Sequence, residues 1–102
     1  KINQDEIFGP VVTIIPFKNE LEAIKIANNT KYGLSATVWS QDKIKSNRVS
    51  KGLKVGIVWE NCWMVRDLRT PFGGIKSSGY GKEGGKEAFR FFTEPKTICR
   101  NS

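Results

Sequence analysis

Residues 61–85 organise this chain; they read N-C-W-M-V-R-D-L-R-T-P-F-G-G-I-K-S-S-G-Y-G-K-E-G-G. Glycine and proline interrupt the stretch too often for it to be regular secondary structure throughout. It is not a solvated linker either, because apolar side chains run from Cys62 to Ile75 and two arginines flank an Asp-Leu pair. A long loop that combines apolar side chains with paired charges is more often a binding loop than a spacer.

Strand and helix patterns alternate before this loop. The predicted strands are rich in β-branched and aromatic residues and cover 11–17 (V-V-T-I-I-P-F), 34–39 (L-S-A-T-V-W) and 55–59 (V-G-I-V-W). Asn19 is the predicted N-cap of a first helix, which the Asn28-Asn29-Thr30 cluster ends. Ser40 or Asp42 caps a second helix through about Lys51, with Gly52 just past its end. This order predicts an α/β fold with a parallel sheet.

The segment after the loop is predicted to hold one more helix and one more strand. Residues 82–92 place Ala88, Phe89 and Phe92 at helical spacing, and Pro95 ends that helix. Residues 96–100 (K-T-I-C-R) are typical of a short last strand.

Composition excludes several classes of function. The chain has a net charge of +7 but its basic residues are scattered singly, so a small basic nucleic-acid-binding module is only the alternative interpretation. It has no histidine, which excludes His-containing catalytic pairs and metal sites, and we expect no metal. Two distant cysteines favour the cytoplasm. No apolar run is long enough for a membrane span, so no membrane partner is expected.

Three motifs in the loop region carry possible chemistry. Residues 79–84 fit the dinucleotide pattern G-x-G-x-x-G, but no strand is predicted directly before them, so we interpret the glycines as shaping a loop. Cys62 lacks an activating base and is interpreted as a buried structural cysteine. Arg66 and Arg69 could clamp a carboxylate, or one of them could pair with Asp67 and hold the loop.

Several motifs in one order resemble the C-terminal part of NAD(P)-dependent aldehyde dehydrogenases over essentially the whole chain. They are Asp5-Glu6-Ile7-Phe8-Gly9-Pro10, Tyr32-Gly33-Leu34, Asn61-Cys62, Pro71-Phe72-Gly73-Gly74 with Lys76, and Ser78-Gly79 followed by Gly81-Lys82-Glu83. Two residues depart from the family pattern: Glu60 replaces a usually apolar residue, and Lys82 stands where arginine is common.

The resemblance implies an oxidoreductase that oxidises an aldehyde to a carboxylic acid with NAD, NADP being possible. The family's catalytic cysteine and general-base glutamate lie upstream of the Glu6–Pro10 motif. The resemblance therefore places no catalytic residue in this chain, and we expect the fragment alone to be inactive. It implies that Glu6 bonds the nicotinamide-side ribose, that Phe8 packs beside it, and that Phe72 lines the aldehyde tunnel.

Within the family, the run from Asn61 to Gly74 most resembles 2-hydroxymuconic and 2-aminomuconic semialdehyde dehydrogenases, whose substrates carry a distant carboxylate. That favours the clamp, with Arg66 as first choice and Arg69 as second. The family's organisation implies that residues 1–94 belong to the catalytic domain and 95–102 to an oligomerisation strand. The expected partners are a small aldehyde and further copies of the chain, as a dimer or tetramer.

Overall fold

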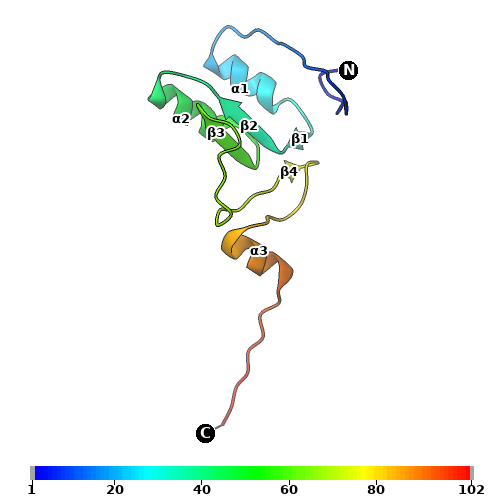
Figure 1. Cartoon of the computed structure of the whole chain (residues 1–102), viewed down its shortest axis with the longest axis vertical. Coiled ribbons are helices and arrows are strands. Elements are labelled where there is room, and N and C mark those ends of the chain that lie inside the picture. Colours follow the sequence, from blue (N-terminus) through cyan, green and yellow to red (C-terminus); the bar gives the residue numbers. More distant parts are fainter. Residues whose placement is uncertain (1, 102) are drawn as a thin grey trace.

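The structure, a computed structural model, describes residues 2–101 of the chain. In chain order its elements are α1 (Glu20–Asn28), β1 (Tyr32–Gly33), β2 (Ser35–Val38), α2 (Lys43–Gly52), β3 (Ile57–Glu60), β4 (Ile75–Lys76) and α3 (Gly85–Phe92). The first two helices and the short strands gather at one end, and α3 lies beyond them (Figure 1). After α3 the chain runs away from the rest as a single extended segment.

The parallel sheet is present as one strand pair. β2 and β3 pair in parallel with Ser35 opposite Ile57 and Val38 opposite Glu60, and α2 is the crossover between them. α2 contacts both strands and also α1. This β2-α2-β3 unit confirms the predicted α/β class, because parallel neighbours need such a crossover.

Side-chain caps start α1 and α2 where the sequence predicts them. The side chain of Asn19 accepts a hydrogen bond from the Glu22 N–H at 3.0 Å. Asp42, rather than Ser40, caps α2 and accepts from two backbone amides at its start. Gly52 is the last residue of α2 rather than the residue past its end, so that detail of the prediction is wrong.

A second, antiparallel pair was not predicted. β1 pairs with β4, with Tyr32 opposite Lys76. Lys76 has a φ of +55°. Its ammonium donates to the carbonyls of Thr30 and Tyr32 at 3.2 and 3.3 Å. Two-residue strands carry no periodicity, so no sequence pattern reveals them.

Two predicted strands do not form within the described residues, and one helix begins later than predicted. Residues 11–17 form no strand, and Ile14 is 90% exposed, because the described chain offers them no partner strand. Residues 96–100 likewise have no strand partner within the described residues. α3 begins at Gly85 rather than Lys82, since Glu83 is engaged in a bridge to Phe72.

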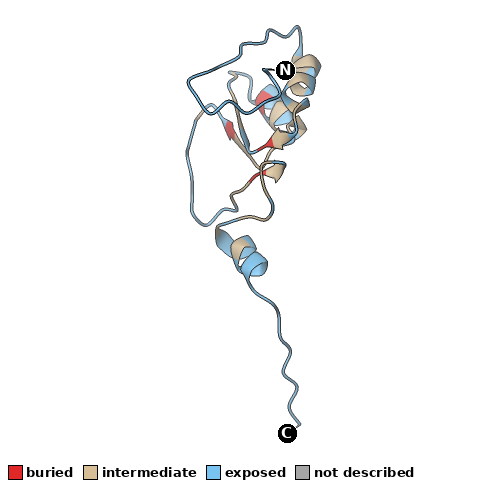
Figure 2. Cartoon of the chain, turned by 90° about the vertical axis from the view of Figure 1, so that its right-hand side faces the viewer, coloured by how far each residue is buried: buried red, intermediate tan, exposed pale blue. Residues whose placement is uncertain are grey.

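The core of this chain is small. Only a few short stretches of the ribbon are buried (Figure 2). Among residues 2–101 Trp59 is the one large apolar side chain that is buried, at 6% exposed. Beside it in the fold, the hydroxyl of buried Ser46 on α2 donates to Glu60 on β3 at 2.8 Å. Glu60 therefore supplies the acceptor that a buried hydroxyl needs, which an apolar residue could not do.

Candidate functional site

The loop that leaves β3 is attached to the rest of the fold at two points, Asn61 and Val65. Asn61 and Ser40 exchange two hydrogen bonds, at 2.8 and 2.9 Å, which tie the loop to the end of β2. The indole N–H of Trp59 donates to the carbonyl of Val65 at 2.8 Å. Because Trp59 is the buried side chain of the core, this bond anchors the loop immediately before Arg66.

Arg69 is paired with its near neighbour Asp67. Its guanidinium donates to both carboxylate oxygens, at 2.9 and 2.5 Å, and its backbone N–H donates to the same carboxylate at 2.9 Å. These bonds hold the pKa of Asp67 below its ordinary value and raise that of Arg69. The sequence left open whether the arginines clamp a carboxylate or whether one of them pairs with Asp67 and holds the loop. Arg69 forms that pair with Asp67.

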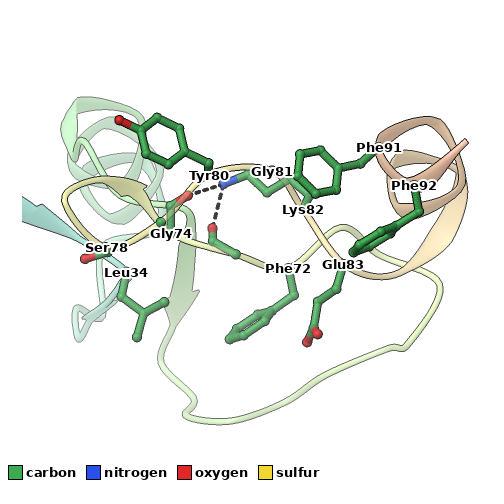
Figure 3. Close-up of a pocket in the computed structure, with 12 residues that line it drawn as sticks. Leu34, Phe72, Gly74, Ser78, Tyr80, Gly81, Lys82, Glu83, Phe91 and Phe92 are labelled. Carbon is green, nitrogen blue, oxygen red and sulfur yellow. Dashed lines mark hydrogen bonds between the residues drawn. The ribbon is translucent and has the colours of Figure 1, made fainter. Parts of the chain in front are cut away.

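Phe72 and Glu83 are joined across the glycine-rich segment. Each donates its backbone N–H to the carbonyl of the other, at 2.7 and 2.8 Å, as an isolated antiparallel bridge. Residues paired in this way present their side chains on the same face. Figure 3 shows the Phe72 ring and the Glu83 carboxylate pointing to the same side.

Arg66 lies against both of these side chains. Its guanidinium carbon is 4.3 Å from the centre of the Phe72 ring, which is close enough for a cation–π interaction. One of its terminal nitrogens donates to a carboxylate oxygen of Glu83 at 2.6 Å. The Arg66 side chain is 34% exposed and that of Glu83 is 61% exposed. The structure thus brings together two of the predicted substrate-binding residues, Arg66 and Phe72.

Lys82 holds the turn that follows Phe72. Its ammonium donates to the carbonyl oxygens of Gly73 and Gly74 at 2.6 and 2.8 Å, as Figure 3 shows. Phe72 and Lys82 also line an open hollow of about 340 Å³, together with Leu34, Tyr80 and Phe91. The ammonium reaches both carbonyls from the position where the family pattern has arginine.

The predicted cofactor residues lie in a different place. Glu6 lines an open hollow of about 430 Å³ with Leu34 and Ser78, and these two residues also border the first hollow. Phe8 is 98% exposed and contributes no lining. A carboxylate at a hollow can accept hydrogen bonds from sugar hydroxyls, so Glu6 fits a ribose, whereas the Phe8 ring is not brought to that hollow.

The remaining motifs give no further site. Cys62 is half-buried rather than fully buried, and Cys99 is exposed. The two-residue β4 lies shortly before the G-x-G-x-x-G motif, but it is an antiparallel strand and Ser77 and Ser78 intervene. Among residues 2–101 no group of three or more metal-binding side chains lies together. The described helices include none long and apolar enough to cross a membrane.

Two residues of the site, Lys82 and Glu83, were not predicted from the sequence to be site residues. The sequence marked Glu83 only as part of a motif and Lys82 only as part of a motif and a departure from the family pattern. In the structure Glu83 bonds Arg66, and Lys82 bonds the turn after Phe72. The partners of Glu83 are 17 and 11 positions away in the sequence, and no spacing rule for helices or strands links such positions.

Known proteins match this chain over nearly its whole length. The model of the aldehyde dehydrogenase family matches residues 1–98. A 2-aminomuconic semialdehyde dehydrogenase of Danio rerio is 58% identical over 95 residues, which are 93% of this chain and 20% of that protein. A 2-hydroxymuconic semialdehyde dehydrogenase of Pseudomonas sp. (strain CF600) is 52% identical over 95 residues, again 93% and 20%. The chain thus spans about a fifth of the length of these curated relatives.

Solved structures agree with these relatives. HpcC from Thermus thermophilus matches with a TM-score of 0.89 and 44% identity, over 99% of this chain and 21% of that one. The C302A mutant of the P. syringae indole-3-acetaldehyde dehydrogenase AldA, in complex with NAD+ and IAA, matches with a TM-score of 0.87 and 44% identity. That match covers 92% of this chain and 19% of AldA.

Proposed function

This chain belongs to the aldehyde dehydrogenase family, and we propose that the complete protein oxidises a carboxylate-bearing semialdehyde with NAD. In this reaction the aldehyde carbon loses a hydride to the cofactor and gains a hydroxyl from water, so that RCHO becomes RCOOH and one proton is released. The nucleic-acid-binding alternative is left without support by the family match.

The observation that carries the substrate class is Arg66 stacked on Phe72. The guanidinium carbon lies 4.3 Å from the ring centre, and the mostly exposed Glu83 carboxylate that it bonds can give way to a substrate carboxylate. Apolar neighbours make an unpaired substrate carboxylate costly, so a fixed guanidinium contributes strongly to its binding. Relatives named for muconic semialdehydes support the same class.

The remaining residues take distinct roles in this proposal. Arg66 binds the distant carboxylate, and Phe72 lines the aldehyde path and supports Arg66. Arg69 is the second choice for binding the substrate carboxylate, and its guanidinium already bonds Asp67. Glu6 and Phe8 would hold the nicotinamide-side ribose of NAD, with NADP as the other possible cofactor. Bound NAD supplies the hydride acceptor.

The organisation of the complete protein is part of the proposal. Residues 1–94 are assigned to the catalytic domain, and residues 95–102 to a strand that pairs with another copy of the chain in a dimer or tetramer. The exposed, extended course of residues 95–101 after α3 supports that role (Figure 1). Cytoplasmic localisation is proposed from the free cysteines. The 102-residue chain alone is expected to produce no NADH.

The test is Arg66→Ala in the complete protein, with Arg69→Ala as the matched control. For a carboxylated semialdehyde we expect Arg66→Ala to raise KM about 30-fold, or about 2 kcal/mol. Arg69→Ala should change it less than about threefold, because the Arg69 side chain is 89% exposed and pairs with Asp67 of its own turn. Steady-state kinetics with a carboxylated aldehyde and an uncharged one of equal length give the comparison.

An equal rise in KM for the carboxylated and the uncharged aldehyde in Arg66→Ala would mean that the arginine only holds the loop. The proposed substrate class would then be wrong, whatever the family.

A further inference from the structure

Glu83 has a position that its sequence neighbours do not explain. It stands directly opposite Phe72 in the backbone bridge, so its carboxylate and the ring share one face. Arg66, from another part of the loop, reaches across both. Three residues far apart in sequence thus form one unit, here called the Arg66 unit: Arg66, Phe72 and Glu83.

Within the Arg66 unit, two interactions hold the guanidinium, and they differ in how easily they are exchanged. Phe72 is half-buried and fixed by its backbone bridge. The Glu83 side chain is 61% exposed and meets Arg66 through a single hydrogen bond at 2.6 Å. A mostly solvated side chain with one contact can turn away into water at little cost.

A carboxylate in this position is chemically equivalent to the carboxylate of the proposed substrate. Both are planar anions that accept from the same guanidinium N–H groups. While Glu83 remains bonded, the charge of Arg66 is neutralised, and an arriving carboxylate meets a neutral pair with a negative charge at its edge. Either the Glu83 side chain moves away or it repels the substrate carboxylate. Both events cost free energy and so reduce the affinity for a carboxylated aldehyde.

We propose that Glu83 is a specificity-determining residue that acts through Arg66: its carboxylate occupies Arg66 until the substrate carboxylate takes that place. This inference rests on the proposed function, because it needs a substrate with a carboxylate. It follows that Glu83 lowers the enzyme's affinity for its own substrate class, in exchange for keeping Arg66 paired in the free enzyme. Positioning of Arg66 itself is left to the Phe72 ring.

The experiment uses two variants of the complete protein, Glu83→Gln and Glu83→Ala. Gln keeps a hydrogen-bond acceptor for Arg66 and removes only the charge, whereas Ala removes both. Glu87→Gln is the matched control, because Glu87 is also a glutamate paired with an arginine, Arg90 at 3.3 Å, and it makes no ion pair with Arg66. The backbone bridge at position 83 needs no side chain, so both variants keep it.

We expect both Glu83 variants to lower KM for the carboxylated aldehyde about fivefold relative to KM for an uncharged aldehyde of equal length. Fivefold corresponds to about 1 kcal/mol, the size of one charge pair at this distance in a largely aqueous setting. The KM ratio in Glu87→Gln should stay at the wild-type value. In an Arg66→Ala background, Glu83→Gln should no longer change the ratio, since the effect passes through Arg66.

Two outcomes would overturn the inference. An unchanged KM ratio in both Glu83 variants would show that Glu83 does not compete with substrate. A rise in the ratio for Glu83→Ala would show that Glu83 positions Arg66 instead. Neither outcome touches the proposed function, which fails only if Arg66→Ala weakens carboxylated and uncharged aldehydes equally.

Discussion

Arg66 and Arg69 are identical residues three positions apart, yet their surroundings give them different roles. Arg69 finds its anion two residues away, and the pair closes a local turn that could form in a short peptide. Arg66 finds both of its partners through the tertiary fold, at Phe72 and at Glu83. The chemical identity of an arginine therefore says that it binds anions, while its neighbours decide which anion it is free to bind.

The local Asp67–Arg69 pair gives a prediction about pH. Hydrogen bonds from Arg69 stabilise the ionised carboxylate, so the pKa of Asp67 lies below its ordinary value of 3.8. The pair's contribution to the turn is therefore fully present above about pH 4 and is lost as the pH falls through the lowered pKa. We expect a carbon-13 NMR titration of Asp67 in the 102-residue chain to show this lowered midpoint. Arg69→Ala should return it toward 3.8, and Arg66→Ala, the control, should leave it in place.

A midpoint at or above 3.8 in the unsubstituted chain would contradict this assignment. Arg69 would then be free to bind a substrate carboxylate, and the choice between the two arginines would have to be reopened.

At the scale of elements, the β2-α2-β3 unit positions the substrate loop through one close contact. Gly56 precedes β3 and donates its backbone N–H to the carbonyls of Gly33 and Leu34, both at 3.1 Å. A Cβ atom added at Gly56 would overlap the carbonyl oxygen of Gly73. The absence of a side chain here lets the turn after Phe72 lie directly against the entry to β3.

Gly56→Ala should therefore displace the turn at Gly73 and with it the ring of Phe72. We expect kcat/KM of the complete protein to fall at least about tenfold on carboxylated and uncharged aldehydes alike, because the change moves the whole loop. The unsubstituted complete protein gives the reference kcat/KM for both aldehydes. Normal kinetics in Gly56→Ala would show that the loop does not depend on this contact.

At the scale of the whole molecule, the chain is extended rather than compact. Its radius of gyration is 18.1 Å and its longest extent 69 Å, against about 13 Å for the radius of a compact 100-residue domain. Its accessible surface of 8918 Å² is roughly half as large again as the ~5,800 Å² expected of a compact monomer of this mass. Most of the ribbon is exposed or only partly buried (Figure 2). The exposed apolar residues include Val12, Ile14, Phe89 and Phe92.

This exposed surface predicts that residues 1–102 associate when they are produced alone. Apolar area leaves water when copies meet, and the unpaired segment 96–100 offers backbone donors and acceptors to a second chain. We expect light scattering to give a dimer or larger species at concentrations near 100 μM, on the order at which exposed apolar surface associates. Truncation after Thr93 should reduce the average mass if residues 96–100 contribute. A monomer at that concentration would contradict the prediction.

The sequence by itself determined the elements whose rules are local. Asn19 and Asp42 start the helices because their side chains satisfy amides within the same turn. The β-branched run at β3 and the crossover helix before it fix the parallel pair. The order of the motifs between Asp5 and Glu83 indicated the family, which the match over residues 1–98 confirms. Residue type made Arg66 and Arg69 candidates, and the resemblance added Phe72.

Only the tertiary structure decided the partners. It placed Arg66 against Phe72 and Glu83, and it formed the short β1–β4 pair, which is too short to show a periodic sequence pattern. It also left residues 11–17 unpaired, although their composition is that of a strand. The physical reason is common to all of these: a cap or a helix is satisfied within a few residues, whereas a strand, or a contact such as that of Arg66 with Phe72 and Glu83, needs a partner brought from elsewhere in the fold.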